Sequence, residues 1–197
     1  MQYPLNISFK LIALAPQIII TDAQNNTLAY IKQKMFKFRE HVEVYTDKNK
    51  SSLVANIKAN KVIDWSARYT FTDEADKELG SVGRKGMKSL WKATYTVFEA
   101  GGTDEKFIIE EENPMAKILD SILGEIPILG LLSTVLFQPK YAATRIGSEE
   151  KVMRLTKKAA FFEGKFQVDK LGDLTPTEEM NLMLSFQMLT LLERRRG

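Results

Sequence analysis

The last twenty-odd residues of this 197-residue chain form a segment that is apolar on nearly every side. On an α-helix, its apolar side chains would surround the axis instead of forming one stripe. A helix of this kind must be enclosed by the rest of the protein, so we predict a central helix at about residues 176–194. The apolar residues are Met180, Leu182, Met183, Leu184, Phe186, Met188, Leu189, Leu191 and Leu192.

The start of this helix is well specified. Thr175 is a suitable N-cap, Pro176 suits the first helical position, and Glu178 completes a Thr-x-x-Glu capping box. A few polar residues remain within the apolar segment, and we expect them to find hydrogen-bond partners on the surrounding wall, because unpaired buried amides cost roughly 1–3 kcal/mol each. These residues are Asn181, Ser185, Gln187 and Thr190.

The chain before this helix reads as about a dozen short β-strands separated by turn residues. Alternating and β-branched side chains mark them, and the gaps are too short for the crossover helices of a parallel sheet. The pattern therefore predicts a barrel or sandwich, and the apolar helix favours a closed antiparallel barrel around it. The expected strands are residues 7–14, 18–21, 27–32, 42–46, 53–59, 62–71, 79–84, 93–98, 106–111, 141–146, 152–156 and 165–170.

One segment, at about residues 114–138, breaks the strand pattern. Helical spacing begins at Met115, and Gly124 and Pro127 then interrupt it. We interpret the segment as an insertion consisting of a short helix and a loop packed on the barrel. A membrane-dipping loop and a dimer contact are the alternatives. A span is disfavoured, because it needs roughly 20 consecutive apolar residues.

The sequence also contains an internal echo. At an offset of 51 residues, Asp22 aligns with Asp73, and the matching strands and basic residues follow in order. A weaker third copy is offset by 124 residues from the first. The predicted unit is a turn, a strand, a basic corner and a second strand.

Length, composition and net charge limit the number of domains, the cellular compartment and the classes of partner. We take residues 1–197 as one domain. The chain has no cysteine, which fits a reducing compartment, and its start lacks the features of a secretory signal. The expected location is therefore cytoplasmic, with no transmembrane span. The net charge of +3 gives no reason to expect nucleic acid as a partner.

These features together resemble the tubby C-terminal-like superfamily, and within it the LURP-one-related and phospholipid-scramblase-like proteins. The residues that carry the resemblance are the hairpin at 73–85, its continuation at 91–98, the earlier echo and the closing helix. The resemblance implies a closed barrel of about twelve strands around a hydrophobic C-terminal helix. It also implies binding to membrane lipids in some relatives. The chain lacks the cysteine-rich segment of scramblases and a residue-by-residue match to the phosphoinositide pocket of tubby.

We find no catalytic or metal-binding motif. His41 is the one histidine, and no nucleophile motif accompanies it, so a solvated strand-end position is the favoured interpretation. The acidic run from Asp73 to Glu78 lacks the ligand order of an EF-hand and reads as a charged hairpin tip. We therefore expect no enzyme activity, no cofactor and no metal.

Two basic clusters occupy equivalent places in the repeat and are the candidate binding site for an anionic lipid headgroup or a protein partner. A solvated set of lysines that protects strand edges is the simpler alternative. The sequence also leaves open a carrier of a small apolar ligand, which a filled lumen would disfavour, and a structural or interaction protein. The candidate residues are Lys34, Lys37, Arg39, Arg84, Lys85 and Lys88.

Overall fold

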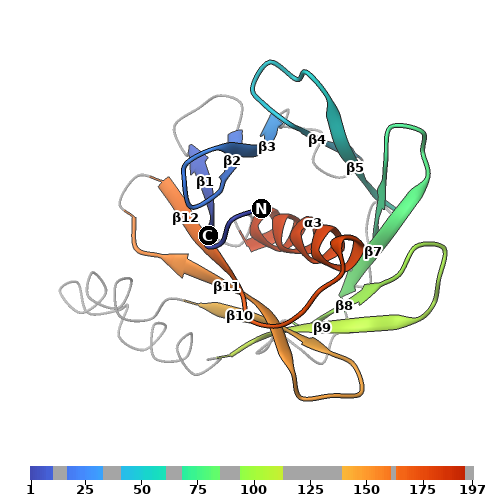
Figure 1. Cartoon of the computed structure of the whole chain (residues 1–197). Coiled ribbons are helices and arrows are strands. Elements are labelled where there is room, and N and C mark those ends of the chain that lie inside the picture. Colours follow the sequence, from blue (N-terminus) through green and yellow to red (C-terminus); the bar gives the residue numbers. More distant parts are fainter. Residues whose placement is uncertain are drawn as a thin grey trace, which may run out of the picture.

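In a computed structural model, the chain forms a closed antiparallel barrel of twelve strands around a single described helix, α3 (Figure 1). The predicted fold class is confirmed. The structure describes residues 1–10, 17–32, 41–60, 68–84, 94–112, 139–160 and 163–193. The predicted insertion at 114–138 lies outside these residues, as do parts of the expected strands at 7–14, 62–71 and 93–98.

Each of the twelve predicted strands has a counterpart, and the predicted helix is found. Where the structure describes them, the strand limits differ from the predicted ones by at most two residues. The elements are β1 (Leu5–Lys10), β2 (Gln17–Thr21), β3 (Thr27–Lys32), β4 (His41–Tyr45), β5 (Leu53–Ala59), β6 (Arg68–Thr72), β7 (Glu78–Arg84), β8 (Thr94–Phe98), β9 (Glu105–Glu111), β10 (Lys140–Arg145), β11 (Lys151–Lys158), β12 (Glu163–Lys170) and α3 (Pro176–Glu193).

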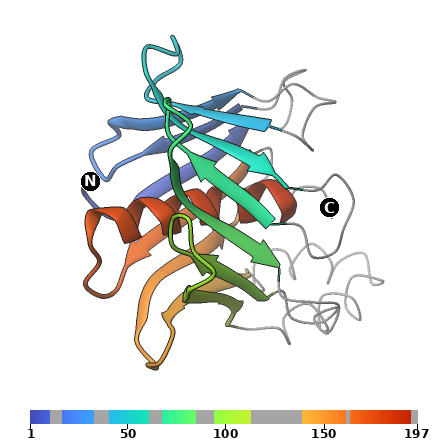
Figure 2. The same ribbon diagram turned by 90° about the vertical axis from the view of Figure 1, so that its right-hand side faces the viewer.

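The strands follow an up-and-down order in which each pairs with its neighbours in the sequence, and β1 pairs with β12 to close the barrel. The connections therefore alternate between two ends. The helix-entry end carries the turns after β2, β4, β6, β8 and β10, and the segment from β12 to α3. The helix-exit end is where the odd-numbered strands and α3 finish. Figure 2 shows α3 running through the barrel from one end toward the other.

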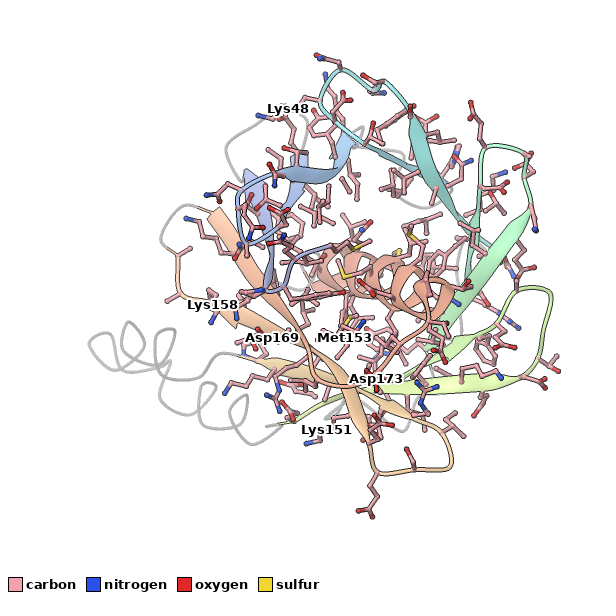
Figure 3. All side chains as sticks on the ribbon, in the orientation of Figure 1. Lys48, Lys151, Met153, Lys158, Asp169 and Asp173 are labelled. Atoms are coloured by element: carbon pink, nitrogen blue, oxygen red, sulfur yellow. The ribbon has the colours of Figure 1, made fainter. Side chains whose placement is uncertain are left out.

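Strand alternation explains the core. In β1, Leu5, Ile7 and Phe9 are buried, and Asn6 between them is exposed. Corresponding residues of the other strands also face inward, so the wall presents an apolar surface to α3. Figure 3 shows that side chains occupy the space between the wall and the helix.

The helix is enclosed as predicted. Every residue from Asn181 to Leu191 is buried. Its backbone comes closest to β7 and β8. The capping box is formed: the Glu178 backbone N–H donates to Thr175 Oγ1 at 3.3 Å, and the Thr175 N–H donates to Glu178 Oε2 at 2.9 Å.

Among the polar residues of α3, Asn181 has a hydrogen-bond partner on the wall as predicted, whereas Ser185 and Thr190 have partners within the helix. Asn181 Nδ2 donates to the wall, at the carbonyl oxygen of Phe98, over 3.0 Å. Ser185 and Thr190 instead donate to carbonyl oxygens of the helix itself, those of Asn181 and Gln187. A short hydroxyl side chain reaches a carbonyl three or four residues back without any partner on the wall, so the expectation of wall partners was wrong for these two residues.

The internal echo corresponds to repeated hairpins. Equivalent turns begin at Asp22, Asp47 and Asp73, so the repeat is about half as long as the predicted 51 residues. Asp22 Oδ1 accepts backbone N–H groups from residues 24 and 26, and Asp73 Oδ1 accepts those of residues 75 and 77. Asp47 forms the same kind of turn between them. Each turn contains a residue of positive φ, and these are Asn25, Lys50 and Asp76.

Candidate functional site

In the sequence, the segments that follow strands ending at the helix-entry end are acidic, and those that follow strands ending at the helix-exit end are basic. The connections at the helix-entry end contain ten acidic and three basic residues, a net charge of −7. In the sequence, the segments that follow the odd-numbered strands and α3 contain eleven basic and five acidic residues, a net charge of +6, and the eleven basic residues lie outside the part of the chain that the structure describes. The positive N-terminal end of the α3 dipole lies at the helix-entry end, where the described turns are acidic.

The strand ends at the helix-exit end add further exposed lysines. Lys32 ends β3 and Lys140 begins β10. Lys158 of β11 lies directly opposite Lys165 of β12 in the strand register, and Figure 3 shows Lys158 at the end of its strand. Sequence reasoning had placed Lys32 in a basic corner but missed Lys140, Lys158 and Lys165, because their common position depends on the barrel topology and not on spacing along the chain.

Five of the six predicted binding residues lie outside the described part of the chain: Lys34, Lys37, Arg39, Lys85 and Lys88. The sixth, Arg84, is half-buried at the end of β7 and takes part in interactions within the protein. The topology nevertheless relates the two clusters, because β3 and β7 both end at the helix-exit end and the segments 33–40 and 85–93 follow them. Their use as a binding site stays a prediction.

The carboxylate of Glu112 pairs with two basic residues on the barrel wall, Lys151 and Arg154. Arg154 makes two hydrogen bonds to Glu112, at 2.7 and 3.1 Å, and Lys151 Nζ lies 2.8 Å from the same carboxylate. Burial alone would raise the pKa of Glu112, but the hydrogen bonds from Arg154 and Lys151 outweigh it and lower that pKa. These two cations are therefore less available to an external anion.

At the helix-entry end, ionic contacts fix the start of α3. Arg145 of β10 donates to Glu178 Oε1 at 2.6 Å and to the carbonyl oxygen of Asp173 at 3.0 Å. Burial would raise the pKa of Glu178, yet the hydrogen bonds from Arg145 and Thr175 outweigh burial and lower it. The helix start is thus tied to the β10 wall, and sequence spacing gave no sign of the pair.

A second set of contacts holds the same turn of the helix from another side. The Tyr3 hydroxyl donates to Glu179 Oε1 at 2.9 Å, and Lys170 Nζ lies 3.2 Å from Glu179 Oε2. Burial and the neighbouring Glu179 carboxylate raise the pKa of Tyr3. The first turn of α3 therefore contacts β10, β12 and the segment before β1.

The described residues contain no arrangement that suggests a reaction. His41 is exposed at the start of β4, as predicted, and its Nε2 lies 2.6 Å from Asn56 Oδ1. Within the described ranges, no three histidine, aspartate or glutamate side chains are grouped so that they could hold a metal ion. No described helix is both long enough and apolar enough to cross a membrane.

Comparisons with known proteins agree with this fold. The chain is similar over its full length to a protein from Arabidopsis thaliana solved by X-ray crystallography, with a TM-score of 0.55, 14% identity and 94% of that chain covered. At that identity the likeness concerns the fold alone. A comparison with curated proteins finds no match. The model of the LURP-one-related family matches residues 27–122, which confirms the resemblance to this tubby-like family that the hairpins and closing helix indicated.

Proposed function

We propose that residues 1–197 form one non-enzymatic, tubby-like domain that binds anionic phospholipid headgroups at the helix-exit end of its barrel. The observation that supports the proposal is the charge of the connecting segments in the sequence, −7 for those that follow strands ending at the helix-entry end and +6 for those that follow strands ending at the helix-exit end and α3. A basic residue near an anionic membrane surface contributes about 1 kcal/mol, so several at one end would give useful affinity. The proposed location is cytoplasmic and peripheral to a membrane.

The filled lumen supports an outside surface as the place of function. The described part of α3 is buried over a continuous stretch, Asn181–Leu191, and apolar residues from the surrounding strands pack against it. A carrier would need a cavity of roughly 300–1,000 Å³ for a drug-sized ligand. The position of α3 therefore disfavours a carrier of apolar ligands.

Sedimentation with vesicles tests the proposal. At low salt, the protein is expected to sediment with vesicles of phosphatidylserine and phosphatidylcholine, and to remain in the supernatant with phosphatidylcholine alone. Lys85→Glu with Lys88→Glu should weaken binding by about tenfold or more, because each tenfold step corresponds to about 1.4 kcal/mol. High salt should release the bound protein, since charges further apart than about 10 Å are screened at 0.1 M salt.

The matched control changes the same net charge at the opposite end. Lys48 and Lys77 are exposed lysines in turns of the helix-entry end. Lys48→Glu with Lys77→Glu should leave vesicle binding within about twofold of the wild type, because these turns would face away from the membrane. Equal losses for the two double variants would show that net charge, and not the helix-exit end, controls binding. Equal binding to both kinds of vesicle would rule out the lipid and leave a protein partner for this end.

A further inference from the structure

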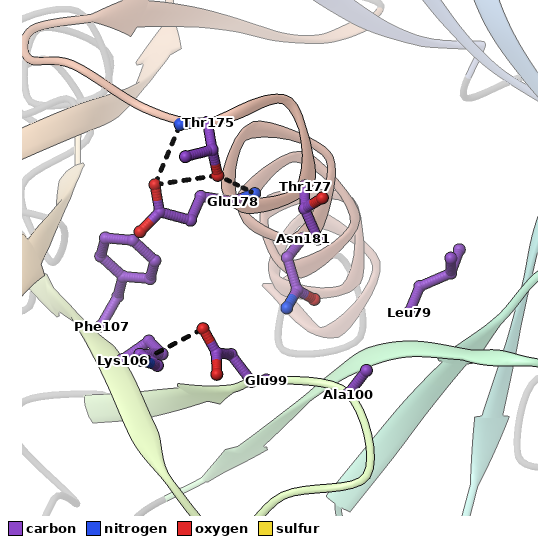
Figure 4. A pocket seen from close by; sticks show the side chains of 9 residues that line it. All are labelled: Leu79, Glu99, Ala100, Lys106, Phe107, Thr175, Thr177, Glu178 and Asn181. Carbon is purple, nitrogen blue, oxygen red and sulfur yellow. Dashed lines mark hydrogen bonds and ion pairs between the residues drawn. The ribbon is translucent and has the colours of Figure 1, made fainter.

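A cavity of about 280 Å³ lies at the helix-entry end, between the first turn of α3 and the hairpin of β8 and β9 (Figure 4). Its apolar lining includes Leu79, Ala100 and Phe107. Glu99, Lys106 and Asn181 supply polar groups. The cavity lies at the opposite end of the barrel from the proposed lipid-binding surface, so it is independent of that function.

Asn181 contributes a buried polar side chain to the lining of the cavity. Its residue is 5% exposed, and Figure 4 shows its side chain directed from the helix toward the β8–β9 hairpin. Because Nδ2 donates to the carbonyl oxygen of Phe98 at 3.0 Å, the orientation of the amide is fixed and Oδ1 is the remaining acceptor. Oδ1 is buried and has no hydrogen-bond partner among the described residues. Such an atom favours a ligand that brings a hydrogen-bond donor.

The charges at the cavity also favour a donor-rich ligand. Glu178 is engaged by Arg145 and Thr175. Glu99, whose side chain is 53% exposed, pairs with Lys106 at 3.1 Å. An exposed ion pair of this type contributes little, about 0–1 kcal/mol, so a second cation can compete for the carboxylate. The lining thus brings the Glu99 carboxylate and the Asn181 amide to the same cavity.

We propose that this cavity binds a small organic amine. Its ammonium group would interact with Glu99 and with Asn181 Oδ1, and its alkyl part would pack against Leu79 and Phe107. The cavity is smaller than typical pockets for drug-sized ligands, roughly 300–1,000 Å³, which restricts the ligand to a compact amine. Gly80 contributes indirectly, because a Cβ at this position would overlap the Asn181 amide.

The inference is tested by titrating the nitrogen-15-labelled full chain with isopentylamine and monitoring the NMR shifts of its backbone amides. Isovalerate, which has the same branched chain and a carboxylate, is the matched probe. We expect amine-dependent shifts at residues 99–107 and 175–181, and at least tenfold weaker binding of isovalerate. Glu99→Gln should weaken the amine about tenfold, and Lys106→Met should strengthen it, because it releases Glu99.

Blocking the cavity provides a variant that does not disturb the core. Ala100 is an exposed turn residue that lines the cavity, and Ala75 is an exposed turn residue at the same barrel end that does not. Ala100→Leu should abolish the amine-dependent shifts, and Ala75→Leu should leave them unchanged. The inference is overturned if isovalerate binds as well as the amine, if Ala100→Leu has no effect, or if neither probe shifts these residues. Failure here would leave vesicle binding unaffected, since that function uses the other end.

Discussion

The side-chain amide of Asn181 fills the space that a side chain on Gly80 would occupy. Gly80 also has a φ of 149°, which L-residues rarely adopt. This contact allows α3 to lie against β7 while Asn181 donates to the carbonyl oxygen of Phe98. The packing of α3 against β7 thus depends on one glycine and one asparagine.

We expect Gly80→Ala to lower the free energy of unfolding by about 2–4 kcal/mol, because it combines overpacking with backbone strain. Chemical denaturation measures the loss. Gly83→Ala is the control in the same strand, since its Cβ would meet Phe98 at an ordinary 3.6 Å, and it should change stability by less than about 1 kcal/mol. In a double-mutant cycle, Asn181→Ala should recover part of the loss from Gly80→Ala. If the stability losses of Gly80→Ala and Asn181→Ala are strictly additive, then these two residues are not in contact.

The Arg145–Glu178 pair should make stability depend on pH. The pKa of Glu178 is lower in the folded protein than its usual value of 4.5. The resulting stabilisation is therefore complete above the pKa of the unfolded chain and is lost as the pH falls through the lower folded pKa. Glu178→Gln should cost about 1 kcal/mol at pH 7, and the difference from the wild type should shrink below about pH 4.

Urea titrations of both proteins between pH 3 and pH 7 measure this effect. Arg145→Met should reduce the same pH dependence, and adding it to Glu178→Gln should cost little more than Glu178→Gln alone. If the stability difference between wild type and Glu178→Gln is independent of pH, then the carboxylate is not stabilised by Arg145.

Lys50 is an unusual residue for its turn position. Its φ is 60°, and the equivalent residues of the other two turns are Asn25 and Asp76, which tolerate this region better. Lys50→Gly should therefore raise the free energy of unfolding by about 0.5 kcal/mol, as relief of strain exceeds the entropy gained by the unfolded chain. Lys48, two residues earlier, is not among the residues of positive φ. Lys48→Gly should lower stability, and a gain from it would contradict the explanation.

The sequence was sufficient to predict the elements of this fold. Strand alternation and Asn or Asp turns located all twelve strands, and Thr175, Pro176 and Glu178 located the helix start. These signals are local, so they do not depend on knowledge of the tertiary structure. The shorter hairpin period was missed because Asp47 matches Asp22 through its turn geometry and not through the residues around it.

Contacts between distant elements could not be predicted. The partner of Asn181 is 83 residues away, and that of Glu178 is 33 residues away. Each depends on how the strands tilt and on where α3 lies within the barrel. For the same reason, the cavity beside Ala100 and the exposed lysines of β10, β11 and β12 became visible only with the structure. The six predicted basic residues were chosen by repetition in the sequence, and five of them lie outside the described residues.

The buried position of α3 within the barrel leaves the surface as the proposed place of function, and we expect the helix to stay in the core of the native protein. Native-state hydrogen exchange tests it directly, because amides that open only on global unfolding report the global free energy. We expect the amides from Leu182 to Leu191 to exchange with the same free energy as the slowest amides of β7 and β8, with or without vesicles. Exchange of these helix amides at a free energy several kcal/mol lower would show that α3 leaves the barrel while the strands stay folded, and would contradict a fixed place for α3 in the core.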